Sequence, residues 1–99
     1  TRWRQLETRD AKYYVAASRT HIYLTTNEDA PNFRTFRVPF ADLSRNSWRE
    51  VIRERDDAVI QDVVVSGPNL LVEWGTGGEN HVEARNQDGV LLKKVAAPN

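Results

Sequence analysis

Short runs of β-branched and aromatic residues, each closed by turn residues, recur along the chain and restrict its fold more than any other feature. They follow one another at a spacing of roughly 8–12 residues, which is typical of an all-β protein. Two of the turns are Ser66-Gly67-Pro68-Asn69 and one that contains Asp88-Gly89, a preferred hairpin pair. We therefore predict eight strands: Lys12–Ala17, His21–Thr26, Phe33–Val38, Trp48–Arg53, Val59–Val65, Leu70–Trp74, Asn80–Arg85 and Val90–Val95.

The strands repeat in two sets of four. Tyr23-Leu24-Thr25-Thr26 and Leu71-Val72-Glu73-Trp74 lie 48 positions apart, at the same place in their sets. A repeat of about 40–50 residues with four strands per unit is typical of β-propeller blades. The predicted fold is therefore all-β, with two four-stranded antiparallel β-propeller blades. The blades are assigned to residues 11–53 and 58–95, the link between them to 54–57, the end of a preceding blade to 1–10 with its last strand at Trp3–Glu7, and the start of the next connection to 96–99.

Two continuous apolar runs support blades over the main alternative. Propeller blades stack face to face, so both faces of a strand are buried and runs such as Val63–Val65 and Leu70–Val72 are tolerated. The alternative is a free-standing β-sandwich or small barrel that acts as a binding or interaction module without catalysis. Its strands should alternate strictly between inside and outside, which these two runs do poorly.

The segment Ser47–Arg55 is ambiguous on local grounds. Ser47 and Glu50 have the spacing of a capping box, and Trp48 and Val51 fall on one helical face, which favours a short amphipathic helix. The repeat favours a strand, because the first blade needs a fourth member before Val59. We predict a strand here.

Composition excludes several classes of function. The 99 residues carry 14 Lys and Arg against 14 Asp and Glu, so a nucleic-acid interface, which needs a basic face, is not expected. The absence of Cys excludes disulfides, thiolate nucleophiles and Cys-type zinc sites. The apolar runs fall far short of the roughly 20 residues that span a bilayer, so no membrane partner is expected. We expect a cytoplasmic location, with a periplasmic one as the alternative.

The neutral total conceals an uneven charge distribution. Residues 1–49 carry nine basic and five acidic side chains, whereas residues 50–99 carry five and nine. Eleven of the basic residues are Arg, which pairs well with carboxylates at packed seams. We expect the two halves to attract each other.

Serine and glycine motifs give no sign of catalysis. None of the four serines lies in a Gly-x-Ser-x-Gly nucleophile turn, and the glycine-rich run lacks the Lys-Ser/Thr that ends a phosphate-binding loop. These residues are Ser18, Ser44, Ser47 and Ser66, and the run is Gly75-Thr76-Gly77-Gly78.

Histidine and aspartate give no metal pattern. His21 and His81 stand at strand starts without a second ligand at metal-binding spacing. Asp56, Asp57 and Asp62 do not form a calcium-loop sequence. We therefore predict no catalytic, cofactor-binding or metal-ligating residue and no cofactor.

One stretch resembles a known family. Ile22–Arg34, with its run Thr26-Asn27-Glu28-Asp29-Ala30-Pro31, is similar to the β-propeller of the prolyl oligopeptidase family. The resemblance continues through Trp48-Arg49-Glu50-Val51-Ile52 and Asp88-Gly89-Val90-Leu91-Leu92-Lys93, and it covers nearly all of Lys12–Val95 in order. The loop at Trp74–Gly78 departs from the family pattern.

This resemblance implies a two-domain serine peptidase (a prolyl endopeptidase) that cleaves short peptides after proline. In the family, an α/β-hydrolase domain carries the Ser, Asp and His triad, and a seven-bladed propeller covers the active site and restricts substrate size. None of the triad maps onto this chain, so it is not expected to be an enzyme alone. The implied partners are the catalytic domain, the remaining blades and short proline-containing peptides. Because the chain begins at Thr1, we expect an excerpt, and isolated blades with open apolar faces should self-associate.

Overall fold

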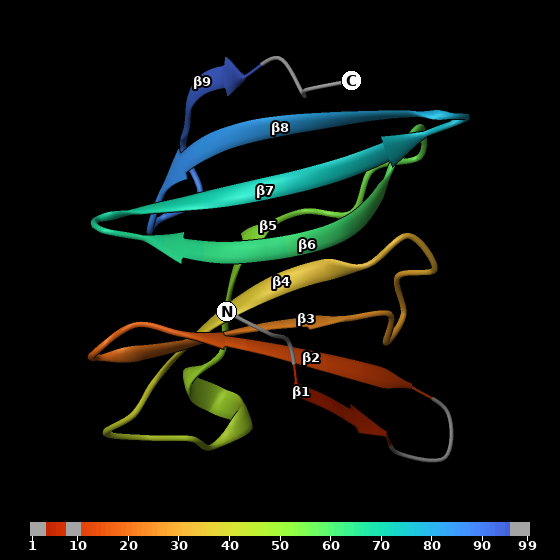
Figure 1. Ribbon diagram of the computed structural model, residues 1–99. Coiled ribbons are helices and arrows are strands. Elements are labelled where there is room, and N and C mark those ends of the chain that lie inside the picture. Colours follow the sequence, from red (N-terminus) through yellow and green to blue (C-terminus); the bar gives the residue numbers. More distant parts are fainter. Residues whose placement is uncertain (1–3, 8–10, 96–99) are drawn as a thin grey trace.

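A computed structural model describes residues 4–7 and 11–95, and in these ranges the protein is all-β (Figure 1). The strands are β1 (Arg4–Glu7), β2 (Lys12–Ala17), β3 (His21–Thr26), β4 (Arg34–Pro39), β5 (Arg49–Ile52), β6 (Val59–Ser66), β7 (Asn69–Thr76), β8 (Glu79–Asn86) and β9 (Leu91–Val95), with one 3-10 helix, η1 (Arg45–Ser47). All eight predicted strands are present: the ends of two match, and those of the other six shift by one or two residues. No helix among the described residues is long and apolar enough to cross a membrane.

The strands form two antiparallel meanders. The first sheet has the order β1-β2-β3-β4-β5, and the second has the order β6-β7-β8-β9. The sheets stack face to face, with the second above the first in Figure 1. The predicted sets of four are therefore confirmed as β2–β5 and β6–β9.

Strand β1 differs from the four-strand unit. It pairs with β2 from Arg4↔Val15 to Glu7↔Lys12 and makes the first sheet five-stranded. The pairing satisfies peptide groups along the edge of β2 that would otherwise stay open. The assignment of residues 1–10 to a preceding blade stays a prediction; Trp3 and residues 96–99 lie outside the described residues.

The ambiguous segment is resolved as a short helical turn followed by a strand. Helix η1 ends at Ser47, where the alternative helix would begin, and β5 then pairs with β4. The Ser47 hydroxyl donates to Asp42 Oδ2 at 2.6 Å, so it holds the preceding loop rather than capping a helix that follows. The predicted strand is confirmed at Arg49–Ile52.

Two backbone conformations shift strand ends. Phe33 has φ +74°, which is outside the β region, so β4 starts at Arg34 instead of Phe33. Gly77 and Gly78 have φ +43° and +108° and form a two-residue hairpin, for which two left-handed residues are required. The expected loop at Gly75–Gly78 is therefore shorter, because β7 continues to Thr76.

The core lies between the facing surfaces of the sheets, a contact we call the seam. The first sheet contributes Ala16, Tyr23, Val51 and Ile52; the second sheet and the residue before it contribute Ala58, Ile60, Val63, Leu70, Val72 and Trp74. Strand β7 alternates, so Leu70 and Val72 are buried in the seam, whereas Leu71 pairs with Val64 on the opposite face. Within this chain the apolar runs are thus buried on one face only.

The other face of the first sheet is covered by residues 40–48, which we call the covering segment. In Figure 1 its helix η1 lies on the side of the first sheet away from the second. The Trp48 ring packs against Phe36, with 5.5 Å between centroids, and the Arg45 guanidinium stacks over both rings. Phe36 is buried as a result.

Candidate functional site

The four serines have structural positions. Ser18 Oγ donates to the carbonyl oxygen of His21 at 3.3 Å and accepts from the His21 backbone N–H at 3.1 Å, which closes the β2–β3 turn. Ser47 holds Asp42, as described above. In the described ranges no serine hydroxyl, including those of Ser44 and Ser66, makes a hydrogen bond to a histidine ring, so the structure pairs no serine nucleophile with a histidine base.

The histidines and aspartates that the sequence analysis considered do not come together in one site. His21 Nδ1 lies 2.7 Å from Thr20 Oγ1; burial lowers the pKa of this imidazole and the Arg37 cation lowers it further. Asp57 is engaged by Arg55. Among the residues that the structure describes, no three His, Asp or Glu side chains are arranged to hold a metal ion.

The turn between β8 and β9, residues 87–90, fastens one end of the seam. Gly89 has φ +92°, and a Cβ built on it would overlap the carbonyl oxygen of Val51 in β5. Arg37 of β4 donates from Nη1 to Asp88 Oδ1 at 2.7 Å and to the Gln87 carbonyl at 3.1 Å. The turn thus docks on the first sheet through close backbone contact and an ion pair.

A buried carboxylate organises the inner face of the second sheet. Glu83 is 5% exposed, and its Oε1 accepts from Trp74 Nε1 at 2.8 Å and from Arg85 Nε and Nη2 at 3.0 and 2.8 Å. Burial would raise the pKa of Glu83, but the hydrogen bonds from Arg85 and Trp74 outweigh it and lower the pKa. Arg85 Nη1 continues to the Gly89 carbonyl at 2.8 Å, so the carboxylate is connected to the docked turn.

The link, residues 54–57, fastens the other end of the seam. The Arg55 guanidinium carbon lies 4.9 Å from the centroid of the Trp74 ring, and its Nε and Nη2 donate to Asp57 at 3.0 and 2.8 Å. Asn32, before β4, accepts at its carbonyl from the Ile60 N–H and donates from Nδ2 to the Arg55 carbonyl at 2.8 Å. Both ends of the seam are therefore closed by polar contacts.

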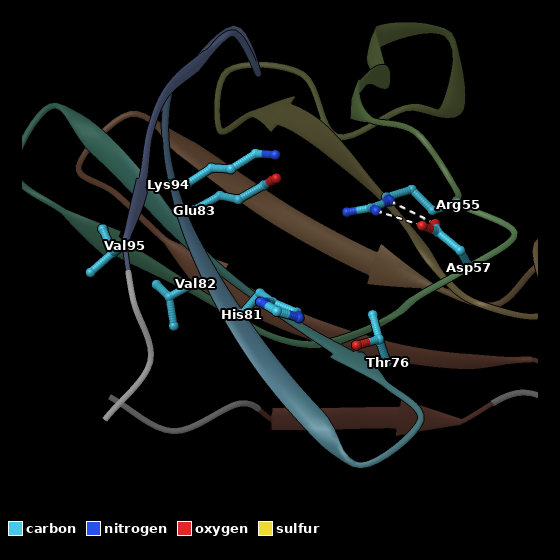
Figure 2. Close-up of a pocket in the computed structure, with 8 residues that line it drawn as sticks. All are labelled: Arg55, Asp57, Thr76, His81, Val82, Glu83, Lys94 and Val95. Atoms are coloured by element: carbon cyan, nitrogen blue, oxygen red, sulfur yellow. Dashed lines mark hydrogen bonds and ion pairs between the residues drawn. The ribbon is translucent and has the colours of Figure 1, made fainter. Parts of the chain in front are cut away.

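A pocket of about 590 Å³ opens beside the link, between it and the neighbouring strands β8 and β9. Figure 2 shows Glu83 and Lys94 on neighbouring strands, both extending toward Arg55. The lining residues are Arg55, Asp57, Thr76, His81, Val82, Glu83, Lys94 and Val95. This pocket is a candidate for a binding site.

Sequence reasoning missed Glu83 and its neighbours. On β8 they alternate with the outward residues: His81 pairs with Trp74, Glu83 with Val72, and Arg85 with the buried Leu70. A carboxylate and a guanidinium two positions apart on the face of a strand that packs against a core are the signal that could have identified them.

Two consecutive antiparallel meanders that pack face to face, β2–β5 with β1 added at its edge and β6–β9, are the arrangement of adjacent blades in a β-propeller. The family model of the prolyl oligopeptidase N-terminal β-propeller domain matches residues 2–99. This chain therefore belongs to the prolyl oligopeptidase family, as a part of that propeller domain. The predicted family and fold are confirmed, and the blade interpretation is favoured over a free-standing sandwich.

Solved structures give the same picture. One is a prolyl endopeptidase, from an analysis of two such enzymes and of inter-domain dynamics in catalysis and specificity; it is 30% identical, with a TM-score of 0.86 over 95% of this chain. Two others are prolyl oligopeptidase B from Galerina marginata, bound to a 25mer macrocyclization substrate and to a 35mer hydrolysis and macrocyclization substrate. They share the fold at 19% and 18% identity, with TM-scores of 0.73 and 0.75 over 87% and 92% of this chain.

The chain is short relative to these proteins. It spans 14%, 12% and 13% of the three solved chains, respectively. No curated protein matches the sequence.

Proposed function

We propose that this chain forms two neighbouring propeller blades of a prolyl oligopeptidase-like serine peptidase, which cleaves short peptides after proline. In that protein it contributes part of the wall that covers the active site and restricts substrate size. The family match over residues 2–99, on a fold whose described serines have no base, is the observation that carries the proposal. The nucleophile, base and oxyanion donors belong to the α/β-hydrolase domain.

A wall that excludes large substrates needs neighbouring blades that do not part. The seam supplies this by an apolar core, by Arg37 on Asp88 at one end and by Asn32 on the link at the other. The outer face of the second sheet, with Val64 and Leu71, is available to the next blade. The contribution of these two blades to catalysis is therefore steric.

The test compares a short peptide with a folded protein as substrates of the full-length peptidase that contains this chain. In a double variant with Arg37→Ala and Asp88→Ala, we expect kcat/KM for a short chromogenic proline peptide to stay within twofold of the parent value. Cleavage of a folded, proline-containing protein should rise several-fold, because the loosened seam admits larger chains.

Arg53→Ala is the matched control, since Arg53 is exposed and has no ion-pair partner among the described residues. It should leave both activities unchanged. If the double variant cleaves folded protein no faster than the Arg53→Ala control, these blades do not restrict substrate size.

A further inference from the structure

Phe33 has a strained backbone at the place where the first sheet meets the link. Its φ is +74°, a conformation that a bulky residue rarely adopts, because its Cβ then crowds the backbone. Composition favours a strand that starts at Phe33, yet β4 begins only at Arg34. Local preference and the folded conformation therefore disagree at this residue, and such disagreements are concentrated at strained or functional positions.

The peptide group between Asn32 and Phe33 is held at both of its ends. Its carbonyl oxygen, that of Asn32, accepts from the Ile60 N–H of β6 at 3.2 Å, and its N–H, that of Phe33, donates to the Ala30 carbonyl at 2.8 Å. The Asn32 side chain adds a bond from Nδ2 to the Arg55 carbonyl of the link at 2.8 Å. These bonds fix the plane of the peptide group, and φ of Phe33 is positive as a result.

The two ends of the seam meet their backbone requirements differently. At the β8–β9 turn the residue with positive φ is Gly89, at +92°, and glycine accepts this conformation without a steric penalty. At the link the residue is Phe33, so closing this end of the seam opposes a backbone preference. The link end is therefore strained, whereas the turn end is not.

We propose that the peptide group between Asn32 and Phe33 is a two-state latch on the seam. In the closed state its carbonyl bonds to Ile60 and Phe33 is left-handed. In the open state the peptide plane rotates by about half a turn, which moves φ of Phe33 into the β region and breaks the bonds to Ile60 and Ala30. The link end of the seam is then loosened. The latch lies in the backbone of this chain, so it does not depend on the proposed function.

The open state keeps most other contacts of this segment. Rotation of one peptide plane leaves the flanking Cα atoms nearly in place, so the Phe33 ring can stay packed against Tyr14, with 5.8 Å between centroids. The Asn32 N–H, which donates to Glu54 Oε2 at 2.7 Å, can also keep its bond. Opening therefore costs two hydrogen bonds, and relief of the left-handed backbone offsets part of that cost.

Amide hydrogen exchange in the 99-residue chain, followed by NMR, tests the latch at Ile60. The Ile60 N–H should exchange about tenfold or more faster than the N–H of Val72, which lies in the central strand β7, because the latch opens without unfolding of the sheets. If Ile60 exchanges only as slowly as Val72, this end of the seam opens only by global unfolding, and the proposal is wrong.

Two variants that both remove the Phe33 ring isolate the backbone strain. Phe33→Gly accepts the left-handed conformation and Phe33→Ala does not, so Ile60 should exchange about tenfold more slowly in the glycine variant. Phe33 is half-buried, so both variants should fold, and urea unfolding checks this. In the control pair, Arg49→Gly and Arg49→Ala at an exposed strand position, glycine should give no slower exchange at Ile60 than alanine. Exchange in Phe33→Gly as fast as in Phe33→Ala overturns the proposal.

Chemical exchange saturation transfer identifies the open state as a minor conformer. Asn32→Ala removes the bond to the Arg55 carbonyl, so it should raise both the population of this conformer and the exchange rate at Ile60 about tenfold. Asn46→Ala, at an exposed position of η1, is the matched control and should change neither. The minor conformer should show the Cα chemical shift of an extended residue at Phe33. If Asn32→Ala has no such conformer, or one in which Phe33 stays left-handed, the peptide group is not a latch.

Discussion

A single buried carboxylate, that of Glu83, ties Trp74 to Arg85 in the second sheet. Burial acts to raise its pKa, but hydrogen bonds from Arg85 and Trp74 lower the pKa below the ordinary value of 4.5. A carboxylate whose pKa is depressed by folding stabilises the protein above its unfolded pKa, and this contribution disappears as pH falls through the folded value. We therefore expect the free energy of unfolding to decrease as pH falls below about 4.5.

The variant Glu83→Gln tests this role of the carboxylate. It leaves the mostly buried Arg85 without its ion-pair partner, so we expect a loss of about 2–4 kcal/mol at pH 7. The loss should shrink as pH falls through the lowered pKa of Glu83, because the parent carboxylate then also becomes neutral. Urea unfolding across pH measures both, with Glu79→Gln, at an exposed position of β8, as the control. If the free energies of unfolding of the parent and of Glu83→Gln change with pH in parallel, the charged Glu83 carboxylate does not stabilise the fold.

The Tyr23 hydroxyl is a second residue with a measurable cost. Tyr23 is 0% exposed, and its hydroxyl lies near Ser18, which acts to lower its pKa, but it makes no hydrogen bond of good geometry among the described residues. We expect Tyr23→Phe to raise the free energy of unfolding by about 1 kcal/mol, because it removes an unsatisfied polar atom and keeps the ring. Tyr13→Phe is the matched control: its hydroxyl donates to Glu28 at 2.9 Å, so that variant should be less stable than the parent. Denaturant unfolding measures both variants. If Tyr23→Phe lowers the free energy of unfolding as much as Tyr13→Phe does, the Tyr23 hydroxyl is not unsatisfied.

At the scale of elements, the β8–β9 turn holds the two sheets together. Gly89→Ala should cost about 2–4 kcal/mol, because the residue has φ +92° and its Cβ would overlap the Val51 carbonyl. Gly67→Ala provides the control: Gly67 also has positive φ, at +57°, but a Cβ there meets nothing within 4 Å. It should cost only about 1 kcal/mol. If the two alanine variants unfold at the same urea concentration, the contact with Val51 is not a constraint.

The strands could be predicted from sequence because each depends on local composition. Lys12–Ala17 and His21–Thr26 were predicted to the residue, since β-branched and aromatic side chains and flanking turns define them. The left-handed Phe33 was not, because no local preference of a phenylalanine favours φ +74°.

The candidate site is formed by residues that are distant in the sequence, so local sequence patterns could not predict it. Arg37 and Asp88 are 51 positions apart, and the pocket combines the link with β8 and β9. The uneven charge of the two halves did indicate attraction between them, and Arg37 with Asp88 is one pair of that kind. The charge distribution did not indicate which basic residue pairs with which acidic residue.

At the scale of the whole molecule, the two outer faces are unequal. The covering segment buries Phe36 on the first sheet, whereas the outer face of the second sheet leaves Val64 and Leu71 partly exposed and the nearby Val59 and Val95 36% and 40% exposed. Isolated apolar sheet faces of this kind associate with one another. We therefore expect the 99-residue chain to self-associate chiefly through the outer face of its second sheet. The covered outer face of the first sheet should contribute little.

Sedimentation velocity over a range of concentrations measures this association. Replacing Val64 and Leu71 with Thr, which keeps β propensity but reduces apolar area, should shift the chain toward monomer. Leu43→Thr, at a position 58% exposed on the covering segment, should leave the association unchanged. A parent chain that stays monomeric and unfolds cooperatively would instead favour a free-standing two-sheet module, because a blade face that needs a neighbour could not remain open to water at no cost.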